Sequence, residues 1–143
     1  MENANRTPWH LWVIGVLALI WNFGGIFDYL MTQFRADWYL EQFTPDQLEY
    51  FTEFDTLFTT FWALGVWGAF IGSILLLARS RFAFHAFVVA LVGIAVTFTI
   101  TVSSPMPASL NTTGVWIFNA AIIVATILLA WYARRMSARG VLR

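Results

Sequence analysis

The sequence contains no cysteine, which excludes disulfide frameworks, thiolate nucleophiles and cysteine-ligated iron or zinc. Charge is also scarce, because only 11% of the 143 residues are charged and the formal net charge is zero. Such a chain offers no basic face for nucleic acid. Because 59% of its residues are hydrophobic, a soluble domain of this size would be unable to bury its apolar surface. Composition therefore predicts a lipid bilayer as the main surroundings.

Enzyme motifs are missing as well. The sequence holds no Ser-His-Asp order, Walker loop, HExxH motif or dinucleotide-binding glycine pattern, and its glycines lie mostly within apolar runs. His10 and His85 have no carboxylate or thiol companions in the sequence, so we interpret them as interfacial side chains rather than metal or haem ligands. We expect no enzymatic activity, no metal and no cofactor.

Four apolar stretches are long enough to cross a bilayer core, which needs roughly 20 helical residues. They cover residues 9–31, 56–78, 82–103 and 114–132. None shows the period-2 alternation of a membrane β-strand, so helices are expected. The sequence therefore predicts an all-α, four-transmembrane-helix bundle that forms a single membrane domain over residues 1–143.

The arginines predict the orientation of this bundle, since loops rich in arginine stay in the cytoplasm. Seven arginines fall on one side of the predicted membrane: Arg6, Arg79, Arg81, Arg134, Arg135, Arg139 and Arg143. Only Arg35 falls on the other side, where it lies among acidic residues. We therefore expect both termini to be cytoplasmic.

The first outer connection carries a helix-start signal. Thr44 offers an N-cap, Pro45 suits the first helical position and Gln47 completes a capping box. Leu48, Phe51 and Phe54 then recur at helical spacing, which favours a short helix over residues 45–54 on the outer membrane surface. A plain surface loop is the alternative.

Asp28 is the one carboxylate inside a predicted span, where charge is costly and often functional. It lies three residues from the end of its span, so a structural role is about as well supported as a ligand or proton role. Two amides, Asn22 and Asn119, also need partners within the bundle, and hydrogen bonds between helices are the commoner explanation for such groups.

These polar residues, together with Thr59, Thr60 and several tryptophans, fall in the outer half of the spans, whereas the inner half is almost wholly apolar. If the protein binds a solute, aromatic rings would stack on it while amides and the carboxylate bond it. The candidate ligand-binding residues are Trp21, Asn22, Asp28, Trp62, Trp116 and Asn119.

Glycines recur at helical spacing within the predicted spans and indicate close helix packing. This set consists of Gly24, Gly25, Gly65, Gly68, Gly72 and Gly93. Any glycine seam that the bundle leaves uncovered is a candidate interface with a membrane-protein partner or a second copy.

The N-terminal half resembles a family of small bacterial four-span membrane proteins commonly labelled "sugar transporter". The resemblance is carried by Thr7-Pro8-Trp9-His10-Leu11-Trp12, Trp21-Asn22, Phe27-Asp28-Tyr29-Leu30-Met31-Thr32, Gln42-Phe43-Thr44-Pro45 and Phe61-Trp62-Ala63-Leu64-Gly65-Val66-Trp67-Gly68. It implies a location in the bacterial inner membrane and supplies no set of binding residues.

Two functions follow from these observations. The favoured one is a non-enzymatic accessory or structural subunit that packs against a larger membrane complex or against itself. The alternative is a transporter or binding protein for a small, sugar-like solute, with an outward-facing polar vestibule. The apolar inner half weighs against the second, because transporters usually need polar lining or broken helices near the midplane.

Overall fold

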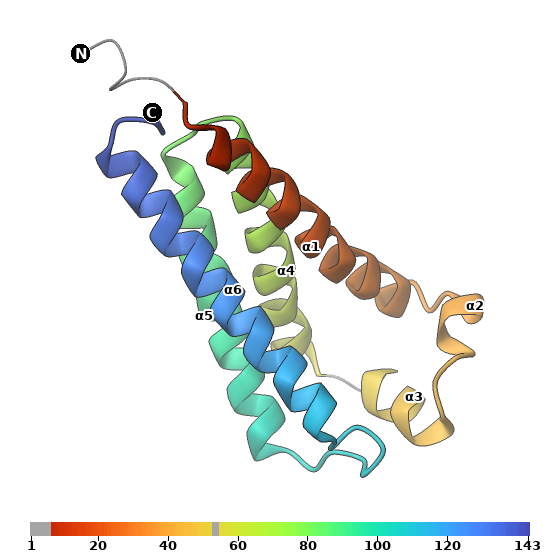
Figure 1. The fold of residues 1–143 in the computed structure, drawn as a ribbon. Coiled ribbons are helices and arrows are strands. Elements are labelled where there is room, and N and C mark those ends of the chain that lie inside the picture. Colours follow the sequence, from red (N-terminus) through yellow and green to blue (C-terminus); the bar gives the residue numbers. More distant parts are fainter. Residues whose placement is uncertain (1–6, 53–54) are drawn as a thin grey trace.

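The computed structural model describes residues 7–52 and 55–143, and the described chain is entirely helical apart from its connections (Figure 1). Arg6 and residues 53 and 54 of the predicted surface helix lie outside this description. The helices are α1 (Trp9–Gln33), α2 (Asp37–Leu40), α3 (Pro45–Thr52), α4 (Thr56–Leu77), α5 (Phe82–Ser103) and α6 (Thr113–Ala138).

Four of these helices, α1, α4, α5 and α6, are long and apolar enough to span a membrane. They begin within one residue of the predicted stretches, and α6 continues past residue 132 to Ala138, so that Arg134 and Arg135 extend the last helix. The chain is thus all-α with four candidate membrane helices. The helix α2 was not anticipated from the sequence.

The long helices alternate in direction, so the bundle has two distinct ends (Figure 1). One end carries the start of α1, the α4–α5 connection and the end of α6, and we call it the arginine end after Arg79, Arg81 and Arg139. The other carries α2, α3 and the α5–α6 connection. We call it the acidic end after Asp37, Glu41, Asp46, Glu49 and Asp55.

Local hydrogen bonds explain where the helices start. The Asp55 carboxylate accepts from the Phe58 backbone N–H at 2.8 Å at the start of α4, and Thr112 plays the same part for α6. At α3, the Thr44 N–H donates to the Gln47 side-chain oxygen and the Gln47 N–H donates to the Thr44 hydroxyl. The capping box predicted from the sequence is therefore present.

Three long helices end in the same way, with one residue in the left-handed conformation. That residue is Arg35 after α1 (φ 52°), Arg79 after α4 (φ 58°) and Gly140 after α6 (φ 74°). Each is followed by a six-to-one hydrogen bond back to the helix, such as Ala36 N–H to the Met31 carbonyl at 3.0 Å. This turn at Arg35 sends the chain away from α1 and into α2.

The helices pack in the order α1, α4, α5, α6, and the α4–α5 interface is the largest. Glycines make that closeness possible. A Cβ added at Gly93 would lie 2.5 Å from the Phe61 carbonyl oxygen, and one added at Gly68 would lie 3.0 Å from the Ala90 nitrogen. The glycines of α4 and α5 thus pack these two helices against each other within the bundle.

The hydrophobic core lies at the arginine end. Its most completely buried side chains include Leu11, Leu76, Phe87, Met136 and Val141. The segment after α6 folds back into it, because Val141 and Leu142 are buried while the Arg143 N–H donates to the Arg79 carbonyl at 2.9 Å. None of the buried residues in this core cluster comes from the acidic end.

Candidate functional site

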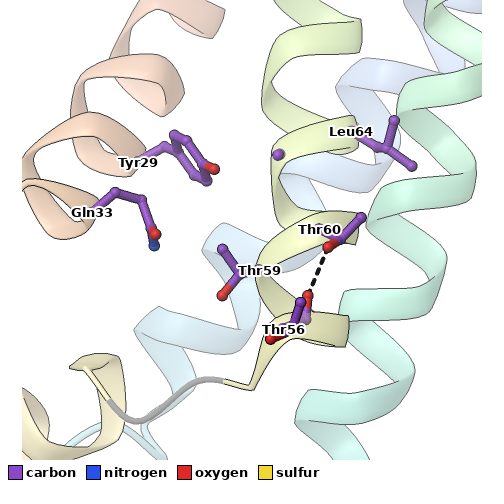
Figure 2. A pocket seen from close by; sticks show the side chains of 7 residues that line it. Tyr29, Gln33, Thr56, Thr59, Thr60 and Leu64 are labelled. Carbon is purple, nitrogen blue, oxygen red and sulfur yellow. Dashed lines mark hydrogen bonds between the residues drawn. The ribbon is translucent and has the colours of Figure 1, made fainter.

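A cleft of about 580 Å³ opens at the acidic end between α1 and α4 (Figure 2). Helix α1 contributes Tyr29 and Gln33 from its last turns, and α4 contributes Thr56, Thr59, Thr60, Ala63 and Leu64 from its first turns. The polar residues of α4 come first along the helix and the apolar pair follows. The cleft therefore changes from polar to apolar along its length.

Among the residues that the structure describes, no side chain that lines this cleft is charged. The Thr60 hydroxyl donates to the Thr56 carbonyl at 2.7 Å, as the dashed line in Figure 2 marks. The Tyr29 hydroxyl, the Gln33 amide and the Thr59 hydroxyl make no hydrogen bond to another group in residues 7–52 and 55–143. They are therefore available to a ligand. The Tyr29 ring also packs edge-on against Trp62, with ring centroids 4.9 Å apart.

Asp28 does not line the cleft and instead ties α1 to α2. Its carboxylate accepts a hydrogen bond from the Tyr39 hydroxyl. Burial raises the pKa of Tyr39 well above its ordinary 10.0, and the hydrogen bond and negative charge of Asp28 raise it further. Around this pair, the Phe27, Trp38 and Phe43 rings pack against Tyr39 or one another. The arrangement orders the connection that follows α1.

Asn22 links α1 to α4 at mid-helix. Its amide N–H₂ donates to the Ser73 hydroxyl at 2.9 Å and to the Ala69 carbonyl at 3.3 Å. Ser73 is fully buried and donates in turn to the Ala69 carbonyl. Trp21, beside it, has its ring centroid 5.9 Å from that of Phe118 on α6. The amide therefore has the interhelical partner that was the commoner expectation.

The remaining candidate residues contact separate partners. The Trp116 indole N–H donates to the Asn111 side-chain oxygen at 2.7 Å, close to the start of its own helix. Asn119 donates to the Val115 carbonyl one turn earlier in α6. Trp62 lies next to the cleft through its contact with Tyr29 but does not line it. The cleft lining includes none of the six residues predicted to bind a ligand.

Only part of the cleft was predictable from the sequence. Thr59 and Thr60 stood out as polar residues of the outer half, whereas Tyr29 and Gln33 did not. Their signal was present in the sequence, because spacing of four places both on one face of α1. What the sequence lacked was the partner helix, since only the tertiary packing brings that face against the threonines of α4.

The glycines divide into covered and uncovered positions. Gly65, Gly68, Gly72 and Gly93 all meet neighbouring atoms of α4 or α5. Gly25 approaches Val66 of α4, with 3.5 Å to an added Cβ. Gly24 has nothing within 4 Å. Among the predicted seam residues in the described chain, Gly24 is thus the one that the bundle leaves uncovered.

At the arginine end, His10 Nδ1 and the Tyr132 hydroxyl form a hydrogen bond that joins α1 to α6. His85 lies on α5 and packs with the Phe82 and Phe84 rings. Within the described residues there is no group of three or more His, Cys, Asp or Glu side chains placed to hold a metal ion. Both histidines contact aromatic rings, His10 those of Trp9 and Tyr132 and His85 those of Phe82 and Phe84.

Comparison of the chain with protein-family models, with curated proteins and with solved structures finds no match. Function must be argued from the bundle and its cleft.

Proposed function

We propose that this chain is a non-enzymatic accessory subunit of the bacterial inner membrane, with both termini in the cytoplasm, and that α1 packs against a helix of another membrane protein. The observation that carries the proposal is the unequal cover of the helices. Helices α4 and α5 each pack against two long neighbours, whereas the outer helices α1 and α6 each have one close long neighbour, α4 and α5 respectively. Of these two outer helices, α1 is the one that carries an uncovered glycine, Gly24. One face of α1 is therefore left for lipid or for a partner.

The uncovered face follows one helical stripe. Leu17 and Ile20 are 61% and 65% exposed, and Gly24 is the next residue along the same face. A glycine with open space lets another helix backbone approach closely, which is the usual basis of helix association in lipid. A stripe of large apolar residues ending in such a glycine favours a helix over a loop as the partner.

Site-specific cross-linking in native membranes tests this proposal. A photoreactive residue at Ile20 should join the chain to one discrete membrane protein, either a second copy or a different chain. The matched control places the same probe at Val92, which is 50% exposed on α5 and lies on no glycine stripe. Lipid adducts alone at both positions, together with a single-chain mass in lipid nanodiscs, would contradict the accessory role.

The transport alternative is supported by the cleft at the acidic end. Against it stands the core at the arginine end, where Leu11, Leu76 and Phe87 are fully buried and would block a solute. Proteoliposome uptake of a sugar by the wild type, reduced in Asp28→Asn, is the result that would favour transport over the accessory role. No uptake by either protein would remove the alternative.

A further inference from the structure

The polarity of the α1–α4 cleft matches that of a lipid molecule. Thr56 lies at the start of α4 and Leu64 lies eight residues further along, about 12 Å deeper at helical rise. The hydroxyl and amide groups are thus at the end of the bundle, while Ala63 and Leu64 lie towards its middle. In a bilayer this gradient runs from the headgroup region into the acyl chains.

The cleft also opens to the side. Thr60 is exposed and Leu64 is 38% exposed on the flank of α4, so the polar and apolar parts both face the surroundings of the bundle. In Figure 2, Thr59 extends from α4 into the space between it and Tyr29 and Gln33 of α1. A ligand would therefore be able to reach the cleft laterally from the membrane.

The lining favours an uncharged head. Its described residues, Tyr29 and Gln33 of α1 and residues 56–64 of α4, supply no cation for a phosphate and no carboxylate for an amine. The carboxylates closest in sequence already have partners, since Asp28 accepts from Tyr39 and Asp55 accepts from the Phe58 N–H. The polar groups of the lining that have no partner within residues 7–52 and 55–143 include the Tyr29 hydroxyl, the Gln33 amide and the Thr59 hydroxyl. Each of these groups can donate and can accept hydrogen bonds. Hydroxyl groups on the ligand complement this set.

We propose that the cleft binds the uncharged, hydroxyl-rich head of a membrane amphiphile, with the start of its acyl chain against Ala63 and Leu64. Tyr29, held edge-on by Trp62, presents its ring and hydroxyl to the head. A volume of about 580 Å³ is within the range of small-ligand sites and suits a head of one sugar ring. This inference is independent of the accessory role and requires only that the four helices span a membrane.

Native mass spectrometry from nanodiscs tests the proposal with stated lipids. The protein is placed in phosphatidylcholine nanodiscs that also contain a glucosyl diacylglycerol or, separately, phosphatidylglycerol. We expect the neutral glycolipid to be retained several-fold more than the anionic lipid. Equal retention of both, or preference for phosphatidylglycerol, overturns the proposal. Free glucose is a third arm, and retention of glucose as strong as that of the glycolipid also overturns it by identifying a soluble ligand.

Variants then locate the site. Thr59→Val removes one hydroxyl at constant volume and should lower glycolipid retention by roughly fivefold, as expected for one hydrogen bond. Thr59→Ser keeps the hydroxyl and should retain the lipid. Thr99→Val is the matched control, because the Thr99 hydroxyl already donates to the Ala95 carbonyl on α5, outside the cleft.

If Thr59→Val and Thr99→Val retain the lipid equally while melting like the wild type, the cleft is not the site. A chain that proves monomeric leaves this result unchanged, so the two proposals fail separately.

Discussion

At the scale of single residues, Asn22 and Asn119 show how one residue type takes two roles. Both lie in apolar helices, and the sequence predicted a hydrogen-bonding partner for each without saying where. Asn22 crosses to α4 and bonds the Ala69 carbonyl and the buried Ser73 hydroxyl. Asn119 bonds only a carbonyl of its own helix. The position of an asparagine along its apolar span does not tell whether it bonds to another helix, because that depends on which residues of the neighbouring helix lie opposite it.

The two asparagines therefore form a matched pair for mutation. Asn22→Leu should destabilise the protein by roughly 0.5–2 kcal/mol, because it removes the interhelical bonds. Asn119→Leu should be close to neutral, since no contact between helices is lost. Unfolding in mixed micelles with increasing SDS measures both. Equal losses in the two variants would contradict a structural role for the Asn22 amide.

The Tyr39 hydroxyl gives a pH dependence with a definite sign. Its pKa in the folded protein lies above its ordinary 10.0, so the unfolded chain releases this proton first as pH rises. Its contribution to stability is complete below about pH 10 and falls as pH rises from there towards the folded-state pKa. Tyr39→Phe lacks an ionisable group, so its melting temperature should fall less over that range.

Thermal unfolding of both proteins in detergent, below and above pH 10, checks this expectation. Tyr50 serves as an internal control, because burial also raises its pKa, with partial compensation by a hydrogen bond to Thr101, and it is unchanged in both proteins. Parallel melting curves across the range would show that Tyr39 contributes nothing to the pH response.

At the scale of helices, the α4–α5 seam was largely readable from the sequence. Glycines at 65, 68 and 72 lie on one face of α4. Gly68 lies opposite Ala86 and Ala90 of α5, whereas Gly72 lies opposite the Phe87 ring. The helix starts at Thr44 and Thr112 were also readable, because capping depends on residues close in the chain. The helix ends were not. Arginine is an unusual residue in the left-handed conformation, so Arg35 and Arg79 carried no turn signal.

The seam predicts opposite results for two glycine substitutions. Gly93→Ala places a methyl group 2.5 Å from the Phe61 carbonyl oxygen and 2.6 Å from the Gly65 nitrogen, so α4 and α5 must separate. We expect a loss of about 1–3 kcal/mol. Gly24→Ala meets nothing within 4 Å and should leave the folded monomer unaffected. A Gly93→Ala protein that melts like the wild type would contradict the packing of this seam.

At the scale of the whole molecule, the proposed orientation with both termini in the cytoplasm rests on arginine placement and is open to direct test. Because the chain has no cysteine, single cysteines can be introduced without removing any. In right-side-out vesicles a membrane-impermeant maleimide should label Ser109→Cys, in the α5–α6 connection, and should label Ala138→Cys only after permeabilisation. Ser109 and Ala138 are both exposed in the folded protein, so a difference in labelling would report the side of the membrane rather than burial of the residue. The reverse pattern would place the termini outside.

The four helices were predictable because lipid imposes their length and composition, and each is encoded locally. The cleft was not, because its lining comes from two helices joined by a long connection. The candidate residues chosen for their chemistry, such as Asp28 and Trp116, proved to have partners near them in the chain. Polar residues with no such partner, such as Thr59 and Gln33, mark the cleft instead.

The location of the core at one end gives the bundle a gradient of stiffness. At the arginine end, buried side chains from α1, α4, α5 and α6 interlock with the folded-back segment around Val141. Towards the acidic end, α4 and α5 stay close at Gly65 and Gly93, whereas α1 meets α4 there through contacts such as that of Tyr29 with Trp62, and no described residue from that end of α1 belongs to the core cluster. Sparse apolar contact lowers the cost of local opening. In a bilayer the two ends would lie in opposite leaflets. A change of thickness in the leaflet around the acidic end would therefore act first on the contact between α1 and α4, while the other leaflet surrounds the well-packed core.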